Sequence, residues 1–164
     1  MTARYYIEHM QLLPHPEGGY YKESYRSPGT IGVSCLPGIG GDRSFSTAIY
    51  FLLEQGDFSA FHRIRSDECW HFYEGAALLI HVLQKSGEYV CKKLGKNLKD
   101  GEVFQFVVPA GAWFASEPAN GTSFALVGCT VAPGFDFADF EMAKESNLLH
   151  LYPEYESLIK RLCR

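Results

Sequence analysis

The chain has 164 residues, of which 46% are hydrophobic and 15% aromatic, so it can bury one full core, and we expect a single domain over residues 1–164. The formal net charge of -4 argues against a nucleic-acid polymer as partner, because phosphate binding needs a basic face. The N-terminus lacks a signal-peptide pattern, no apolar run reaches transmembrane length, and the cysteines are widely spaced. We therefore expect a soluble, cytoplasmic protein that does not bind membranes.

The order of predicted elements indicates an all-β protein with helical ends. A short helix is expected over residues 3–12, and a strand with period-two alternation over residues 20–26. Residues 27–42 are rich in Gly and predict a long loop. From residue 45 to 131, short β-rich runs alternate with Gly and Pro turns, as in a sandwich or barrel. Apolar residues at helical spacing predict a helical tail over residues 154–162.

The segment from Gly56 to Gly75 carries the strongest motif. Five residues separate Gly56 from His62, three separate Ile64 from Glu68, and six separate Glu68 from Gly75. This spacing resembles the first motif of the cupin superfamily, in which a second His stands at the position of Ile64. The second cupin motif is echoed around Pro109-Ala-Gly111, with Phe114 where the last His ligand would stand.

Two longer strings make the resemblance more specific. His-Pro-Glu-Gly-Gly-Tyr-Tyr over residues 15–21 and Asp-Glu-Cys-Trp-His-Phe-Tyr-Glu-Gly over residues 67–75 are similar to the uncharacterised cupin branch called DUF985, or cupin_5. The resemblance implies an all-β fold: a cupin double-stranded β-helix (jelly roll) barrel with a short N-terminal helix and a C-terminal helical tail. It also implies a homodimer, and it implies no settled reaction.

The ligand positions of the motif are incomplete for a metal. A His-x-His pair on a strand points both imidazoles to one face, where a Glu and a third His complete the site. Here Ile64 and Phe114 replace two imidazoles, which leaves His62 and Glu68, and two protein ligands make a weak site. No cofactor is predicted. A weak divalent metal held by His62 and Glu68 stays open, with His71 or Glu17 as a further ligand.

The same replacements predict an apolar pocket with few polar groups, the usual composition of a small-molecule site. Its apolar walls are expected to be Ile64, Trp70, Phe72 and Phe114. His62 and Glu68 would be its central polar groups, and Glu17, Arg26 and Tyr50 are further candidates for ligand contact. Arg26 could hold an anionic group such as a phosphate. His15 and His81 are expected to be solvated.

Four functions are compatible with these residues, and whether the protein is an enzyme stays open. The first is a cupin that binds a polar, sugar- or nucleotide-like ligand without a strong metal site. The second is a sugar-nucleotide isomerase or epimerase, with His62 as general base and Glu68 orienting it, by similarity to metal-free epimerases of related barrel shape. The third is a weak-metal enzyme, and the fourth a structural or storage-type dimer with a vestigial pocket.

Overall fold

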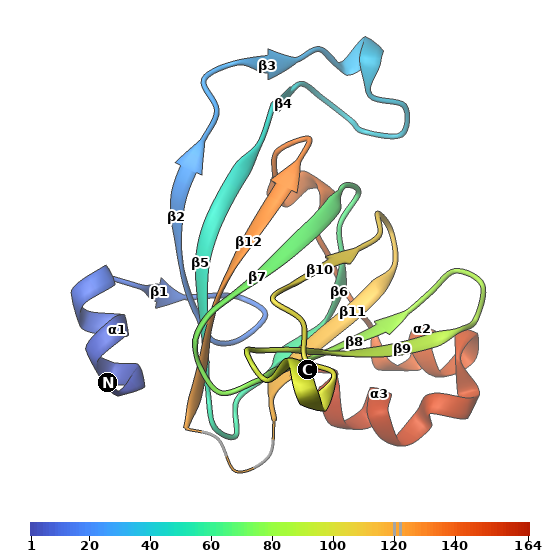
Figure 1. The fold of residues 1–164 in the computed structure, drawn as a ribbon. Helices are drawn as coiled ribbons and strands as arrows, with labels where there is room; N and C mark the ends of the chain where they lie inside the picture. The colour runs from blue at the N-terminus through green and yellow to red at the C-terminus, as the bar shows by residue number, and fades with distance from the viewer. Residues whose placement is uncertain (120, 122) are drawn as a thin grey trace.

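The protein is described by a computed structural model that covers residues 1–119, 121 and 123–164. Two antiparallel sheets face each other and enclose the core (Figure 1). The larger sheet has the order β1 (Leu13–Pro14), β2 (Tyr20–Arg26), β5 (Thr47–Glu54), β12 (Phe124–Ala132), β7 (Asp67–Gly75) and β10 (Gln105–Val108). The smaller sheet has the order β13 (Glu141–Met142), β6 (Ser59–Arg63), β11 (Trp113–Pro118), β8 (Leu78–Leu83) and β9 (Tyr89–Leu94).

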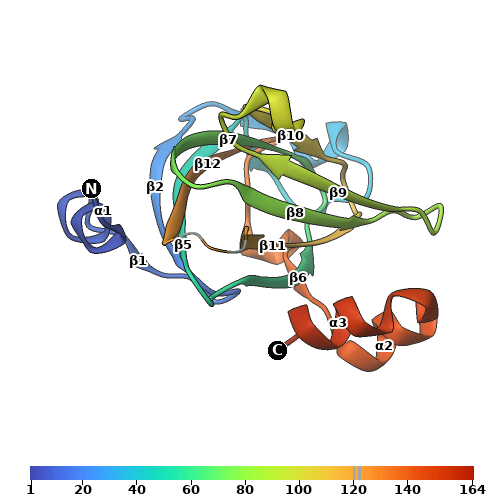
Figure 2. The ribbon, with the colours of Figure 1, turned by 60° about the horizontal axis from the view of Figure 1, so that its bottom comes forward.

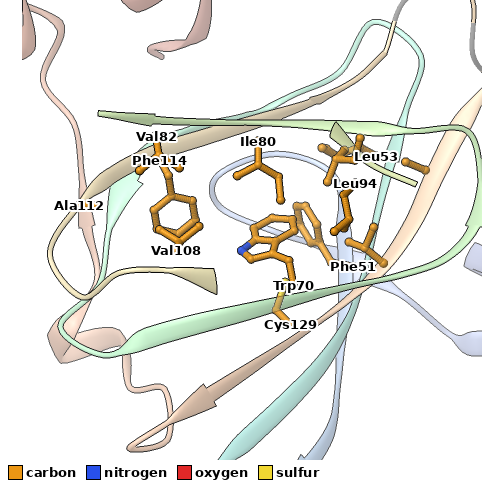
Figure 3. Close-up of a cluster of buried hydrophobic side chains, with 13 residues drawn as sticks. Phe51, Leu53, Trp70, Ile80, Val82, Leu94, Val108, Ala112, Phe114 and Cys129 are labelled. Carbon is orange, nitrogen blue, oxygen red and sulfur yellow. The ribbon is translucent and has the colours of Figure 1, made fainter. Parts of the chain in front are cut away.

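Strand alternation decides which side chains enter the barrel. In β5, Phe51 and Leu53 are buried in the core, whereas Tyr50 points outward and is exposed. In β7, Trp70 is buried and its neighbour His71 lies on the outer face. The inner faces meet in one apolar cluster, shown in Figure 3, that includes Phe51, Leu53, Trp70, Ile80, Val82, Leu94, Val108 and Phe114. Burying each of the larger side chains contributes roughly 1.5–3 kcal/mol to stability.

The register of the larger sheet arranges its inward side chains in rows. The row nearest the mouth of the barrel runs through Arg26, Thr47, Val131 and Glu68. The next row inward contains Glu23, Ile49, Cys129 and Trp70. The mouth is therefore partly polar, while the deeper rows belong to the apolar core.

Helices cover the outer faces of both sheets (Figure 2). Helix α1 (Ala3–Met10) packs on the larger sheet against Leu52, Phe124 and Leu126. It is shorter than the predicted helix because Gln11 adopts a left-handed conformation, with φ of 55°, and ends it. No helix in the described part of the chain has the length and apolar character needed to cross a bilayer.

The C-terminal tail contains two helices where the sequence predicts one. Helices α2 (Glu145–Leu151) and α3 (Glu156–Leu162) are joined by the 3-10 turn η4 (Pro153–Tyr155). Leu148 and Ile159 are fully buried against the smaller sheet, in contact with a cluster that includes Phe61 and Trp113. The predicted helix over residues 154–162 is present, but its first turn belongs to η4 and the α-helix begins at Glu156.

His81 of β8 is buried rather than solvated, which corrects the sequence-based expectation. One of its ring nitrogens lies 2.7 Å from the Tyr89 hydroxyl and the other 3.0 Å from a carboxyl oxygen of Glu117. Arg161 of α3 pairs with the other oxygen of Glu117. This chain of contacts ties α3 to the smaller sheet and satisfies the buried imidazole.

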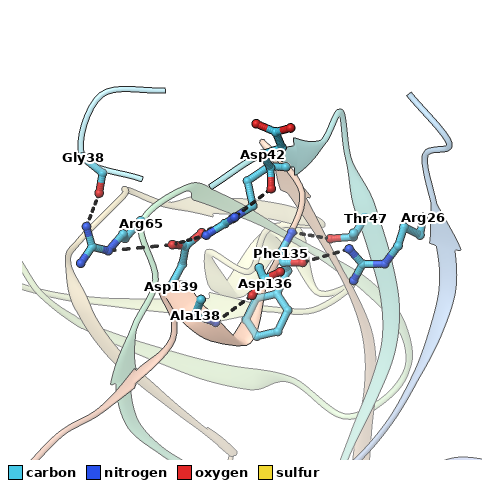
Figure 4. Close-up of polar contacts among 10 residues, drawn as sticks. Arg26, Gly38, Asp42, Thr47, Arg65, Phe135, Asp136, Ala138 and Asp139 are labelled. Carbon is cyan, nitrogen blue, oxygen red and sulfur yellow. Dashed lines mark hydrogen bonds and ion pairs between the residues drawn. The ribbon is translucent and has the colours of Figure 1, made fainter. Parts of the chain in front are cut away.

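The loop predicted over residues 27–42 is a long flap beyond the barrel mouth (Figure 1). It contains β3 (Thr30–Ile31) and the 3-10 turn η1 (Val33–Cys35), and it returns through β4 (Arg43–Ser44). Arg43 forms a bidentate ion pair with Asp139, at 2.7 and 2.9 Å, and both side chains are 6% exposed (Figure 4). Asp139 lies in η3 (Phe137–Asp139), so this pair joins the flap to the segment after β12.

Candidate functional site

A cavity of about 300 Å³ opens at the mouth of the barrel, between the two sheets and beneath the segment that follows β12. Titratable side chains line its inner part: His15, Glu17, His62 and Glu68. Arg26, Glu23 and Asp136 stand among its other polar groups. The apolar walls come from Tyr21, Ile49, Ile64, Val131, Phe135, Phe137 and Phe140.

The turn between β1 and β2 brings Glu17 into the cavity. Gly18 and Gly19 follow with φ of 114° and 73°, values that a side chain disfavours. A Cβ at Gly18 would also lie 2.2 Å from the carbonyl oxygen of Phe58. The two glycines therefore let the backbone turn tightly against the loop before β6, and the Glu17 carboxyl points inward with its side chain 8% exposed.

Glu17 is the partner of His62, at 3.0 Å between the carboxyl oxygen and Nε2. The other ring nitrogen, Nδ1, lies 2.7 Å from the carbonyl oxygen of Ala60, which can accept but not donate, so Nδ1 carries a hydrogen. Burial lowers the pKa of His62 to about 3 and raises the pKa of Glu17 well above its usual range, with further help from the charge of Glu68. Burial therefore favours the neutral form of both groups, which lie in contact at 3.0 Å. The expectation that Glu68 orients His62 is corrected.

Glu68 is a separate acid–base group at the start of β7. Its position is 8% exposed, and burial raises the pKa of its carboxyl to about 7, against smaller lowering effects from Cys129 and Trp70. The Trp70 indole nitrogen has no hydrogen-bond partner of normal geometry among the described residues, although it faces Glu68 closely enough to affect that pKa. At neutral pH this carboxyl can both accept and release a proton.

His15 is buried beside these groups, which corrects the expectation that it is solvated. Its Nδ1 accepts a hydrogen bond from the backbone N–H of Glu17 at 3.3 Å and lies 3.7 Å from a carboxyl oxygen of the same residue. Burial lowers the pKa of His15 to about 4, so the ring is neutral near pH 7. The ring packs edge-on against Tyr21, with 4.5 Å between centroids.

The predicted wall residues divide between the pocket and the core. Ile64 lines the cavity, as expected from its place two residues after His62. Trp70 and Phe114 are each 1% exposed and lie deeper, in the apolar cluster, with the Phe114 ring 4.1 Å from that of His62. Phe72 also packs against this cluster rather than at the mouth. These three rings belong to the apolar core beneath the cavity and support its floor.

Tyr50 lies on the outer face of the larger sheet, where its ring packs edge-on against Tyr73. The strand period places it there, since the inward positions of β5 are Ile49 and Phe51. The expectation that Tyr50 contacts a pocket ligand is therefore corrected.

The segment after β12 supplies an aromatic wall that the sequence-based reasoning missed. Phe135, Phe137 and Phe140 all line the cavity. The segment is held by the ion pair between Arg43 and Asp139 and by the hydrogen bond from the Phe135 N–H to Thr47, at 2.9 Å (Figure 4). The sequence signal for this wall is the presence of three Phe within six residues of a loop that is otherwise rich in small residues.

The side chains near His62 do not suit the metal centre of the first cupin motif, which residues 56–75 resemble. Both ring nitrogens of His62 are engaged, one with Ala60 and the other with Glu17. His71 faces outward, 3.0 Å from the hydroxyl of Thr130. Among the described residues, no group of three or more His, Cys, Asp or Glu side chains has an arrangement suited to hold an ion.

Comparisons with known proteins agree with this architecture. Residues 4–143 match the family described as Cupin superfamily (DUF985). An uncharacterised protein of Saccharomyces cerevisiae is 36% identical over 166 aligned residues, which cover 88% of this chain and 77% of that protein. A solved structure of a hypothetical protein from Leishmania major has a TM-score of 0.91 and 37% identity, and the match covers 99% of both chains.

Two further solved structures extend the comparison. A protein from Shewanella oneidensis has a TM-score of 0.90 and 40% identity, covering 100% of this chain and 98% of that one. Oxalate decarboxylase from Bacillus subtilis has a TM-score of 0.56 and 13% identity, covering 91% of this chain and 36% of that one, a likeness of fold alone. The double-stranded β-helix is thus the fold, and this chain belongs to the DUF985 (Cupin_5) family of the cupin superfamily.

Proposed function

We propose that the protein binds a small polar organic molecule in the cavity at the mouth of the barrel. The observation that carries this proposal is the convergence of four buried titratable side chains, His15, Glu17, His62 and Glu68, on one cavity with aromatic walls. Burying such groups costs stability unless each is fully paired, and groups buried at that cost gather at functional sites. A volume of about 300 Å³ lies at the lower end of ligand pockets, which favours a single ring over a dinucleotide.

The binding test is a thermal-shift screen of sugars, sugar phosphates, nucleosides and amines, followed by calorimetry of the compounds that stabilise the protein. A true pocket ligand should lose affinity in the Ile64→Trp variant, which fills the cavity. It should bind equally well to Glu88→Gln, an exposed substitution in the turn before β9. Unchanged affinity in Ile64→Trp would place the ligand elsewhere and contradict the proposal.

Proton transfer on the bound molecule is a second candidate function, of the isomerase or epimerase kind. The observation that favours it is a pair of buried carboxyls in one cavity: Glu68, whose pKa burial raises to about 7, and Glu17, whose pKa burial raises well above its usual range. The Glu68 carboxylate would remove a proton from the carbon next to a carbonyl, which gives an enolate. Glu17 would return a proton to that carbon, and the two carboxyls would then re-equilibrate with solvent.

His62 is a positioning residue in this scheme, because neither of its nitrogens is free for substrate. Exchange of solvent deuterium into ketoses and keto-sugar nucleotides, followed by NMR, tests the scheme. Glu68→Gln should slow exchange about 100-fold or more, while Glu88→Gln keeps the parent rate. Equal exchange rates in Glu68→Gln and the parent would eliminate proton transfer and leave the binding proposal intact.

A further inference from the structure

The cavity is richer in carboxyl groups than in cationic side chains. Glu17, Glu23, Glu68 and Asp136 all line it. Arg26 is the single Arg or Lys among the described lining residues. A cavity with this composition repels anions, because an entering phosphate would meet more carboxylates than guanidinium groups.

The guanidinium of Arg26 is already engaged. Its Nε and Nη2 donate to the two carboxyl oxygens of Glu23, at 3.0 and 2.7 Å. Its Nη1 donates to the carbonyl oxygen of Phe135 at 3.2 Å (Figure 4). An anionic ligand would have to replace Glu23 in a bidentate pair, which is the stronger geometry for a carboxylate. This pairing argues against the phosphate-binding role expected of Arg26.

The aromatic wall has a geometry suited to a cation. The ring centroids of Phe135, Phe137 and Phe140 lie 5.0–6.2 Å apart, and the ring planes cross at 71–81°. The three rings therefore pack edge to face against one another, and they line the cavity together with Tyr21. Ring faces carry negative electrostatic potential and attract ammonium groups, especially groups too crowded by substituents to donate hydrogen bonds.

From these observations we propose that the pocket selects a substituted ammonium cation, held against Phe135, Phe137 and Phe140 with Glu68 facing its charge. The inference rests on the proposed binding function and names the ligand class of the same site. The cation would compensate the carboxylates that the cavity gathers, and its alkyl substituents would replace water on the phenyl faces.

Binding of a cation should also ionise Glu68. The titratable groups that line the cavity with Glu68 are Cys129 from β12, Glu17 and His15 from the turn before β2, His62 from β6, Glu23 and Arg26 from β2, and Asp136 from the segment after β12. The pKa values of His15 and His62, lowered by burial to about 4 and about 3, keep both rings neutral above pH 6. Burial holds the pKa of Glu17 and of Cys129 well above their usual ranges. Glu68, with a pKa of about 7, is therefore the carboxyl expected to change charge near neutrality.

Choline is the probe, because its quaternary nitrogen cannot titrate. Its neutral carbon isostere, 3,3-dimethylbutan-1-ol, and inorganic phosphate serve as controls. We expect choline to bind at least about tenfold more tightly than the alcohol, and phosphate not to bind at millimolar concentration. Choline affinity should rise about tenfold between roughly pH 6 and pH 8, following ionisation of a group with a pKa of about 7, and Glu68→Gln should abolish this rise.

A second variant separates the aromatic wall from the carboxyl. Phe137 is 52% exposed, so Phe137→Leu should fold normally and weaken choline about threefold to thirtyfold. Phe104→Leu, at a phenylalanine 51% exposed outside the cavity, should leave choline affinity unchanged. Equal affinities for choline and the alcohol, tighter binding of phosphate, or no choline binding would each overturn the cation inference. If a sugar bound to the parent and did not bind to Ile64→Trp, the proposed binding function would still hold although the cation inference had failed.

Discussion

Glu68→Gln should make the protein more stable at alkaline pH. In the folded state burial raises the pKa of Glu68 from 4.5 to about 7, so the folded protein holds this proton to higher pH than the unfolded chain does. The contribution of the group to stability is therefore complete below pH 4.5 and is lost as the pH rises through 7. At roughly 1.4 kcal/mol for each pH unit, the loss amounts to about 3 kcal/mol.

The neutral amide of Gln does not undergo this loss. We expect the difference in unfolding free energy between Glu68→Gln and the parent to shift by about 3 kcal/mol in favour of the variant between about pH 4.5 and about pH 8. Any packing cost of the amide is common to both conditions and cancels. His15 and His62, whose lowered pKa values act in the opposite direction as the pH falls below 6.5, are also common to both proteins.

Urea unfolding at these two pH values gives the measurement, and both lie away from the sequence pI of about 5.8. The exposed variant Glu88→Gln should show no such shift. If the unfolding free energy of Glu68→Gln differs from that of the parent by the same amount at both pH values, burial does not raise the pKa of Glu68. The acid–base interpretation of the site would then be wrong.

Three further substitutions test how the site is held. Arg43→Met should cost about 2 kcal/mol in urea unfolding, less than for an isolated buried pair because Arg65 stays 3.9 Å from Asp139, and the double variant with Asp139→Leu should regain most of it; no regain would refute pairing as the cause. Gly18→Ala should destabilise by more than Gly87→Ala, since both have positive φ but only Gly18 meets a carbonyl oxygen at 2.2 Å; equal losses would contradict this close approach. Leu148→Ala should cost about 2–5 kcal/mol, and a loss under about 1 kcal/mol in thermal or urea unfolding would mean that α2 is not anchored there.

Two expectations stay predictions, the homodimer implied by the family resemblance and the cytoplasmic location inferred from sequence pattern. The homodimer can be measured by light scattering, and the cytoplasmic location by fractionation of the source cells. Neither is needed for the pocket, because the residues that carry the proposals line a cavity within one chain.

Within the site, local pattern predicted the residues whose direction depends on strand alternation. Because residues two apart in extended backbone point to the same side, His62 and Ile64 both face the cavity, and Glu68 joins them from the start of β7. Strand alternation also predicted that Trp70 and Phe72 point into the barrel, but it could not predict how far below the mouth they lie. Depth depends on the register of β12 against β5 and β7, which is set by pairing across the sheet.

The sequence by itself determined the class of fold, the inward direction of His62, Ile64 and Glu68 and, through the resemblance to the cupin motifs, the two missing imidazoles, because these depend on residue type and spacing over a few neighbours. The tertiary structure alone decided that Glu17 pairs with His62 across 45 positions of chain, that Arg26 is committed to Glu23, and that the Phe wall lies over the pocket. It also set the protonation states, because burial determines those pKa values and burial is a property of the closed barrel.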